Sequence, residues 1–176
     1  MKLLLTTIAA LVLVGCGRQE LLQWKFEKEF YAAVKNNDRE AVKKAVADSR
    51  IRPYQMQNAL RYAADKGQNE VVKILIASGT DVNSSTYGLT PLMFAVSNGH
   101  KEITKLLINK GADINTTTRY TKRTFDQGVE TLQFNGKQEK ATTALDQALA
   151  SQHTETADFL RKHGGKTGEE LKAEGK

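Results

Sequence analysis

Two similar stretches in the middle of the chain decide its fold. Residues 58–83 read NALRYAADKGQNEVVKILIASGTDVN, and residues 90–115 read TPLMFAVSNGHKEITKLLINKGADIN. Aligned from their first residues, the two stretches share their apolar positions, two glycines and a closing Asp-x-Asn. Two unrelated amphipathic helices could share the apolar spacing, but they would not also share the glycines and the closing motif. The chain therefore contains an internal repeat.

Two weaker copies flank this pair. A copy that begins at Thr143 follows the 90–115 stretch at a longer interval than that stretch follows 58–83, so an insertion precedes it. Its matching positions are Leu145, Ala148, His153, Glu155, Leu160 and Gly164. Another copy precedes residue 58, and it matches at Ala33, Asn37, Glu40, Val42 and Ala45. Four copies thus account for most of the chain.

The 90–115 copy predicts a pair of helices. The Thr90 hydroxyl is placed to accept a hydrogen bond from the free N–H groups of a helix that begins at Pro91, where proline is favoured. Gly99 is placed to end this helix, because glycine adopts a positive φ without strain. Apolar residues over 103–107 form the stripe of a second helix. One such pair cannot bury its own apolar face, so neighbouring copies must stack into one continuous core.

The full pattern resembles the ankyrin repeat. It runs from Gly88-Leu89-Thr90-Pro91-Leu92 through Gly99-His100 to Gly111-Ala112-Asp113-Ile114-Asn115, and the resemblance covers roughly residues 27–165. It implies an all-α solenoid of about four helix-turn-helix repeats that binds other proteins. It also implies that His100 and His153, which share one repeat position, are structural residues.

The chain departs from the ankyrin pattern at several positions. Asn58-Ala59 stands where the pattern has Thr-Pro, and Met93 and Asp146 stand where it usually has histidine. We therefore expect looser helix starts in the two copies before residue 90. Thr167-Gly168-Glu169-Glu170 has capping-box spacing, so we expect residues 166–176 to form a polar tail whose short helix closes the stack.

The N-terminus resembles a bacterial lipoprotein signal peptide. Met1-Lys2 supplies a positive start, and Leu3–Gly15 carries no charge but is too short to span a bilayer as a helix. The only cysteine, Cys16, directly follows Leu13-Val14-Gly15, which is similar to the lipobox of bacterial lipoproteins. The resemblance implies that residues 1–15 are removed and that Cys16 is acylated. An ordinary signal peptide followed by a coincidental cysteine is the alternative.

The residues after the cysteine bear on where the protein is found. Gly17, rather than Asp, follows Cys16, which in Gram-negative lipoproteins resembles sorting to the outer membrane. We therefore expect a lipid-anchored protein of the bacterial cell envelope, at the outer membrane and facing the periplasm. Residues 16–26 would form the anchor, the tether and the start of the first helix, and residues 27–165 the repeat domain.

The composition excludes several classes of protein. A single cysteine excludes an intramolecular disulfide framework and a four-cysteine zinc site. The formal net charge is +6, but the basic residues are not clustered enough for nucleic-acid binding. Their surplus lies in residues 18–61, where it either attracts anionic lipid weakly or forms a solvated helix face. We predict no catalytic residue, metal ligand or cofactor, because no acid or nucleophile keeps a fixed spacing with the histidines.

The insertion lies in the segment 116–142, before the last copy. Stretches 119–125 and 129–134 are rich in β-branched and aromatic residues, and Asn135-Gly136 is a turn signal. We expect an extended hairpin or loop there, where ankyrin proteins project a hairpin finger. Aromatic and arginine side chains favour a partner-binding role. A tolerated surface insertion is equally open, because longer loops cost little.

The predicted partner-binding residues come from two sources. Ankyrin proteins bind with their finger tips and the exposed side of their first helices, and the resemblance places Thr86, Tyr87, Leu89, Ser97 and Asn98 there. The insertion adds Arg119, Tyr120, Arg123, Phe125 and Phe134. We expect Tyr87 and Leu89 to face solvent, with core packing of Leu89 as the alternative.

These features predict a monomer that binds another protein in the envelope and contacts no nucleic acid. An inhibitor or immunity protein that caps a toxin or an enzyme is one specific form of this role. The rival from another class is an envelope enzyme with its site in the insertion. Asp126 and Glu130 are its only candidate carboxylate pair, and they are more readily explained as solvated.

Overall fold

The structure is a computed structural model that describes residues 20–86, 88–118, 120–126, 129–134 and 141–175. The predicted signal segment, residues 1–15, and Cys16 lie outside these residues. The first helix covers residues 20–35. The later elements are α2 (Arg39–Val46), α3 (Pro53–Asp65), α4 (Asn69–Ala77), α5 (Pro91–Ser97), α6 (Lys101–Asn109), β1 (Tyr120–Asp126), β2 (Val129–Phe134), α7 (Ala144–Ala150), α8 (Thr154–Lys162) and α9 (Gly168–Ala173). No helix in the described part is both long and apolar enough to cross a lipid bilayer.

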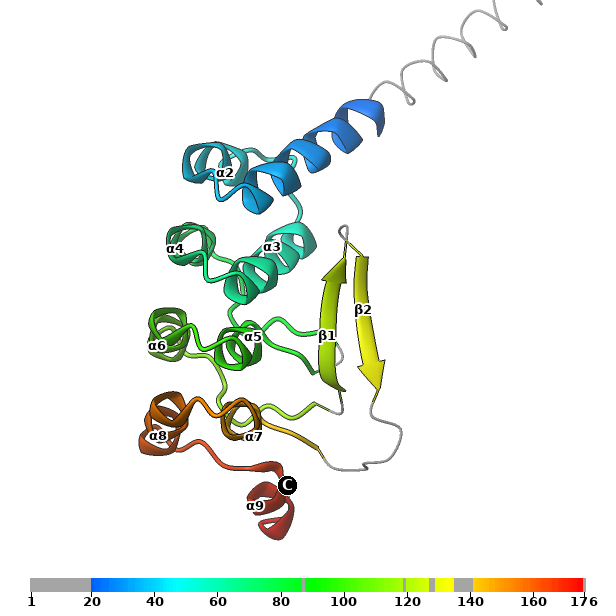
Figure 1. The fold of residues 1–176 in the computed structure, drawn as a ribbon. Coiled ribbons are helices and arrows are strands. Elements are labelled where there is room, and N and C mark those ends of the chain that lie inside the picture. Colours follow the sequence, from blue (N-terminus) through cyan, green and yellow to red (C-terminus); the bar gives the residue numbers. More distant parts are fainter. Residues whose placement is uncertain (1–19, 87, 119, 127–128, 135–140, 176) are drawn as a thin grey trace, which may run out of the picture.

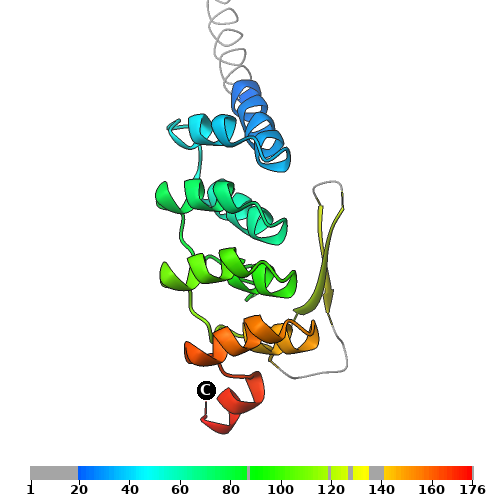
Figure 2. The same ribbon diagram turned by 60° about the vertical axis from the view of Figure 1, so that its left-hand side comes forward.

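The helices form two layers of one stack (Figures 1 and 2). One layer holds the first helix of each copy, namely residues 20–35, α3, α5 and α7. The other layer holds the second helices α2, α4, α6 and α8. Helix α3 packs on α5 and α5 on α7, while α2 packs on α4 and α4 on α6. The predicted solenoid of stacked helix pairs is confirmed.

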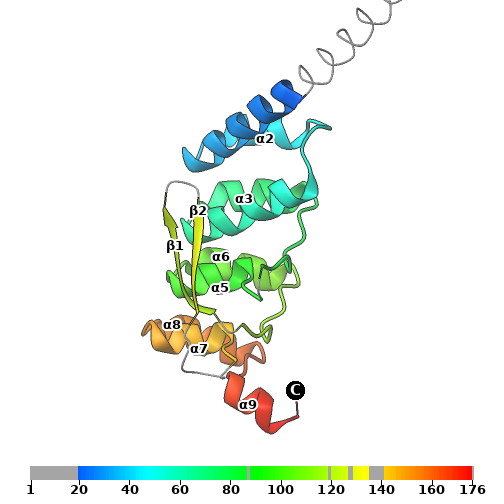
Figure 3. The same ribbon diagram turned by 90° about the vertical axis from the view of Figure 1, so that its right-hand side faces the viewer.

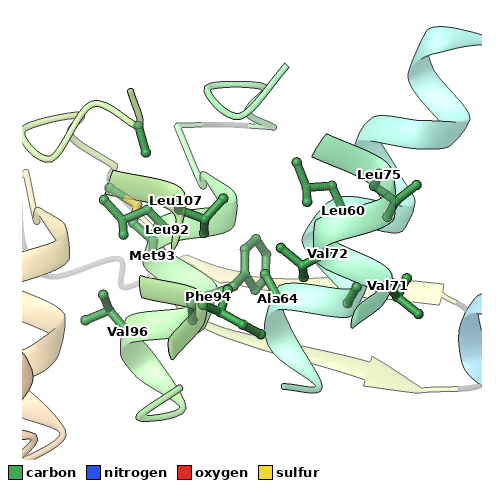
Figure 4. Close-up of a cluster of buried hydrophobic side chains, with 14 of the residues drawn as sticks. Leu60, Ala64, Val71, Val72, Leu75, Leu92, Met93, Phe94, Val96 and Leu107 are labelled. Carbon is green, nitrogen blue, oxygen red and sulfur yellow. The ribbon is translucent and has the colours of Figure 1, made fainter. Parts of the chain in front are cut away.

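One continuous apolar core runs through the stack (Figure 4). Leu60, Leu92 and Leu145 occupy the same position in successive copies, and the exposed fraction of each is 0%. Figure 4 shows side chains from two neighbouring copies meeting, with Leu60 and Leu75 from one and Leu92 and Leu107 from the next. Each fully buried leucine contributes about 1.5–3 kcal/mol. Because this core crosses the boundary between copies, each copy depends on its neighbours.

Glycine sets how closely the copies approach. A Cβ atom at Gly67 would lie 2.7 Å from the ring of His100, and one at Gly99 would lie 2.9 Å from the ring of His153. Both glycines also have a positive φ, at 70° and 71°. A larger residue would therefore clash with the next copy as well as strain the backbone.

The two histidines join each copy to the one before it. The Nε2 atom of His100 lies 2.9 Å from the carbonyl oxygen of Asp65, and that of His153 lies 3.2 Å from the carbonyl oxygen of Ser97. Since a carbonyl only accepts, Nε2 is the donor in both bonds. The prediction that His100 and His153 are structural is confirmed.

The same turn position is not glycine in the terminal copies. Asn37 and Gln152 stand there, with φ of 54° and 58°. The copy after that of Asn37 has Gln68 in the place of the histidine, and the copy that contains Gln152 is followed by the single helix α9 rather than by another helix pair. A side chain is therefore tolerated at this turn only where no histidine packs against it, at the cost of a left-handed backbone.

An asparagine ladder joins the loops that follow the second helices. The Asn83 side chain donates to the carbonyl of Gly111 (3.1 Å) and accepts from the backbone N–H of Asp113 (2.8 Å). The Asp81 side chain holds Asn83 in place by accepting from its backbone N–H (2.9 Å). The repeated Asp-x-Asn motif therefore links one copy to the next through hydrogen bonds to its backbone.

The ladder continues for one further step and then stops. Asn115 donates to the carbonyl of Gly164 (3.1 Å) and accepts from the backbone N–H of Lys166 (2.9 Å). In the last copy Lys166 and Gly168 occupy the aspartate and asparagine positions. This copy therefore offers no asparagine side chain to a further neighbour.

The start of α3 corrects one expectation. This helix begins at Pro53 rather than beside Asn58, and the Gln55 side chain accepts from the backbone N–H of Arg52 (2.8 Å). A proline at the first helical position and a buried side-chain cap make a defined start. The looser start predicted for this copy is wrong, because the helix starts more than a turn earlier than the ankyrin pattern places it.

The short helix α9 closes one end of the stack. Thr167 Oγ1 accepts from the backbone N–H of Glu170 (3.2 Å), and Glu170 Oε2 accepts from that of Thr167 (2.7 Å), which confirms the capping box. Asp146 Oδ2 accepts from the N–H groups of Thr143 (2.9 Å) and Gly168 (2.7 Å). The aspartate that replaces the usual histidine therefore ties α7 to α9.

The insertion forms an antiparallel hairpin. Tyr120 lies opposite Phe134, and Asp126 lies opposite Val129. At the base, Thr118 and Thr142 exchange two backbone hydrogen bonds of 2.9 and 2.8 Å. The predicted hairpin is confirmed, while the Asn135-Gly136 turn signal lies outside the described residues. The hairpin runs beside the first-helix layer, from the level of α7 towards that of α3 (Figures 1 and 3).

Replacing Asn115 with alanine should test the ladder. The change removes both hydrogen bonds to the last copy, so we expect the free energy of unfolding to fall by about 1–2 kcal/mol. Urea unfolding followed by circular dichroism measures it. The control is Asn109→Ala, an exposed residue of α6, for which we expect a change within about 0.5 kcal/mol. Equal stability of the two variants would contradict the structural role of the ladder.

Candidate interaction surface

The side of the stack that carries the hairpin is the candidate interaction surface. We call it the first-helix face: the outward sides of residues 20–35, α3, α5 and α7, with the loop 84–90 and the β1–β2 hairpin beside them (Figure 3). The second helices lie on the other side of the core (Figure 1). A partner on this face would contact several copies at once.

A polar cluster links the first three copies in this layer. Asn58 Nδ2 donates to the hydroxyl of Tyr31 (3.3 Å). The Arg61 guanidinium donates to the side-chain oxygens of Asn58 and Thr86. Arg61 is only 6% exposed, so it holds the loop 84–90 against α3 from within. Burial raises the pKa of Tyr31, and the hydrogen bond from Asn58 partly opposes this.

Two further hydrogen bonds continue this pattern towards the last copy. Asn98 Nδ2 donates to Asp65 Oδ1 (3.1 Å), and Ser97 Oγ donates to Gln147 Oε1 (2.6 Å). Each boundary between successive copies therefore has a side-chain hydrogen bond in the first-helix layer. These bonds hold the first helices in register, and so they give the face a defined shape.

Two exposed carboxylates of the second layer have shifted pKa values. A hydrogen bond from Lys73 lowers the pKa of Glu70, and one from Lys101 lowers that of Glu155. These are exposed ion pairs, which contribute little to stability. Within the described part of the chain, no three His, Cys, Asp or Glu side chains come together to hold a metal ion. The arrangement offers shape and hydrogen bonds to a partner.

A hollow between α6 and α8 is a competing candidate site. Lys105, Phe159 and Lys162 help to line it, and Lys101 forms an ion pair with Glu155 at its edge. The Lys105 ammonium lies 5.9 Å from the centre of the Phe159 ring. Cationic and anionic groups are mixed there, so the hollow favours no one class of ligand.

Comparison with known families identifies the fold. The chain matches a family model for ankyrin repeats (three copies) over residues 30–118. The chain belongs to the ankyrin-repeat family. A search of curated proteins finds no match. Beyond the matched region, α7 and α8 add a further helix pair of the same kind after the hairpin. Ankyrin repeats form protein–protein interaction modules, and this domain is such a module.

The binding residues predicted from the ankyrin pattern differ in exposure. Asn98 is exposed, and Thr86 and Ser97 are half-buried. Leu89 is only 7% exposed and belongs to the apolar core, so the expectation that it faces solvent is wrong and the core-packing alternative holds. Its backbone pairs with Thr86 across a tight turn, which directs the side chain into the stack. That the other residues bind a partner stays a prediction.

The remaining predicted residues lie in or beside the hairpin. Tyr87 and Arg119 are outside the described residues. Tyr120, Arg123, Phe125 and Phe134 belong to the two strands, with Arg123 opposite Leu132 and Phe125 opposite Glu130. Their side chains are outside the description, so their role also stays a prediction.

Sequence reasoning missed five residues that form hydrogen bonds in this layer: Tyr31, Asn58, Arg61, Asp65 and Gln147. A signal for Arg61 was present, since it shares the repeat position of Met93 and Asp146, where the ankyrin pattern usually has histidine. Asn58 shares the position of the capping Thr90, but α3 starts earlier and leaves it inside the helix. Its amide therefore bonds to neighbouring side chains instead of capping.

Replacing Arg61 with methionine, the residue at the same position of the next copy, should loosen the loop 84–90. The hydrogen bonds to Asn58 and Thr86 are lost, so we expect the free energy of unfolding to fall by about 1.5–3 kcal/mol. The backbone N–H of Leu89, which donates to Thr86 at 3.0 Å, should also exchange faster with deuterium. Arg39→Met, an exposed residue of α2, is the matched control. Unchanged exchange at Leu89 would contradict this role for Arg61.

Proposed function

We propose that this ankyrin-repeat protein is anchored by lipid at Cys16 to the bacterial outer membrane, where it faces the periplasm and binds another envelope protein through the first-helix face. The family supports binding to a protein. The lipobox-like Leu13-Val14-Gly15-Cys16 supports the anchor, and Gly17 supports the choice of membrane. The binding would need no chemistry, since the face offers shape and hydrogen bonds.

The observation that carries the binding proposal is the position of the hairpin. The loop 84–90, one copy earlier, is a tight turn closed by the bridge between Thr86 and Leu89. Strands β1 and β2, which follow one copy later, instead extend along the first-helix layer past their own copy (Figure 3). A partner docked on the first-helix face would therefore also meet the hairpin. An isolated two-stranded hairpin is only marginally stable in water, so such a contact would also order it.

The anchor would attach the stack by one end. The described chain begins with the helix over residues 20–35 at one end of the stack, and α9 lies at the other (Figure 1). A lipid attached four residues before this helix would leave the first-helix face open from the side. Inhibition of a toxin or an enzyme would be one form of binding on that face. We do not propose a reaction at Asp126 and Glu130, because no contact among the described residues supports one.

Shortening the insertion should test the binding proposal. Because Thr118 and Thr142 already pair, residues 119–141 can be replaced by an Asn-Gly dipeptide that closes a two-residue hairpin turn. A photo-crosslinking amino acid at the exposed Asn98 position should capture a discrete envelope protein in intact cells. We expect this capture to fall about tenfold in the shortened variant, as the loss of one interface hot spot predicts.

The control places the same crosslinker at Glu102, which is exposed in α6 on the other side of the stack. It should not capture this protein. Circular dichroism establishes that the shortened variant remains folded. Equal capture from both positions, or capture that the shortening leaves unchanged, would contradict binding through the first-helix face.

Replacing Cys16 with serine should test the anchor. The variant lacks the thiol that receives the lipid, so it should incorporate no radiolabelled fatty acid and keep its signal segment. Gel mobility and acyl labelling in growing cells measure both effects. A serine variant that is still labelled and processed as the parent would refute the assignment of Cys16.

A further inference from the structure

The first helix presents an apolar patch to solvent at its beginning. Leu21 is 62% exposed, Leu22 49% and Trp24 58%. We call these three residues the N-terminal patch. In the described part of the chain only two other large apolar side chains are comparably exposed, and they lie singly at Tyr54 and Leu149. Three such side chains within four residues form a cluster, which marks a contact site more strongly than isolated ones do.

The patch cannot turn inward, because the opposite side of the same helix is already occupied. Phe30 is 1% exposed and belongs to the core. Phe26 packs under the Arg50 guanidinium, 4.3 Å from its ring centre, and Gln23 Nε2 donates to the carbonyl of Arg50 (3.2 Å). These contacts fix the rotation of the helix. Leu21 and Trp24 therefore face outward in the folded protein, and the half-exposed Leu22, four residues before Phe26, lies at the edge of the occupied side.

Lysines accompany the patch on the outward side. Residues three or four apart share a helix face, which places Leu21, Trp24, Lys25 and Lys28 together. The Lys28 ammonium lies 5.1 Å from the centre of the Trp24 ring, and the Lys25 ammonium lies 3.9 Å from the Glu29 carboxylate oxygen Oε1. In helices that lie in a membrane interface, apolar and aromatic side chains enter the lipid, while neighbouring lysines lay their methylene chains along the apolar surface and keep their ammonium groups at the headgroups. Tryptophan is enriched at that depth, and lysine attracts anionic headgroups.

The short distance along the chain between the patch and Cys16 indicates that a membrane covers the patch. Leu21 follows Cys16 by five residues. Even fully extended, five residues span at most about 18 Å. If Cys16 carries lipid in the membrane, the patch therefore cannot lie far from the headgroups.

We infer that the N-terminal patch inserts into the interface of an anionic lipid bilayer, with Leu21, Leu22 and Trp24 among the headgroups and Lys25 and Lys28 against lipid phosphates. This inference rests on the proposed anchor at Cys16. The first helix then acts as a second membrane contact beside the lipid, and it sets the angle at which the stack leaves the membrane. Helix α9 lies at the opposite end of the stack from the first helix (Figure 2), so it would stand away from the bilayer.

Trp24 is the only tryptophan of the chain and reports on its own surroundings. The full-length protein, purified from membranes, is reconstituted in vesicles of phosphatidylethanolamine and phosphatidylglycerol that carry bromine on the acyl chains near the headgroup. We expect the bromine to quench Trp24 fluorescence and dissolved iodide to quench it weakly. Strong quenching by iodide alone would place Trp24 in water and overturn the inference. Protection from both quenchers would indicate a protein contact, such as a second copy, and would overturn it as well.

Two pairs of variants separate insertion from simple proximity. Leu21→Ser with Leu22→Ser should lower the quenching by bromine several-fold, whereas Leu149→Ser, at an exposed leucine of α7, should leave it unchanged. Replacing both Lys25 and Lys28 with glutamate should make the quenching by bromine independent of the phosphatidylglycerol content. Replacing both Lys110 and Lys172 with glutamate should leave this dependence in place. Circular dichroism establishes that each variant is folded. Equal quenching in the leucine variant and its control would refute insertion.

Acyl labelling at Cys16, measured on the same samples, distinguishes this inference from the proposed function. Label at Cys16 with Trp24 in water would keep the anchor and overturn insertion of the patch. Quenching by bromine without label would keep the patch as a membrane contact and overturn the anchor.

Discussion

A pair of short amphipathic helices has an apolar face that it cannot cover, and in this protein the next pair covers it. The leucines at equivalent positions are fully buried only because each copy lies against its neighbour. The distance between neighbouring copies is set by close contacts such as that of the His100 ring with Gly67. The hydrogen bonds at each boundary follow from that spacing. The side chain of Asn83 meets the backbone of the next copy only when the two copies are at this distance.

The first and last copies of the stack each have a neighbour on one side only, and the two ends differ in what covers them. At the far end, Asp146 and the capping box of Thr167 dock α9 across the last copy. At the near end, the second helix α2 presents Lys43 and Lys44 to solvent, and the first helix presents the N-terminal patch. A covered end and an apolar end give the stack a direction. With a lipid beside the apolar end, the membrane would take the place of a further repeat.

The hairpin changes what the stack offers to a partner. Ankyrin repeats provide a row of first helices, and in this chain an insertion between the third and fourth copies runs beside that row (Figure 3). Its base is held by the pairing of Thr118 with Thr142, so its direction is set where it leaves the stack. The polar bonds from Tyr31 through Arg61 to Gln147 hold the row itself in register. A defined face beside an extended hairpin is the physical basis of the proposed binding.

The sequence by itself determined whatever depends on residues close together in the chain. The repeat, the cap at Thr90, the turn at Gly99 and the strands of the insertion follow from local preferences that the alignment of the copies makes visible. Only the tertiary structure decided which side chains meet across copies. Leu89 is buried because its turn points into the stack, and Arg61 bonds to Thr86 because α3 and the loop 84–90 lie against each other. It also decided that the hairpin lies along the first helices. These contacts join residues that are far apart in the chain, and their geometry exists only once the apolar faces have been buried against one another.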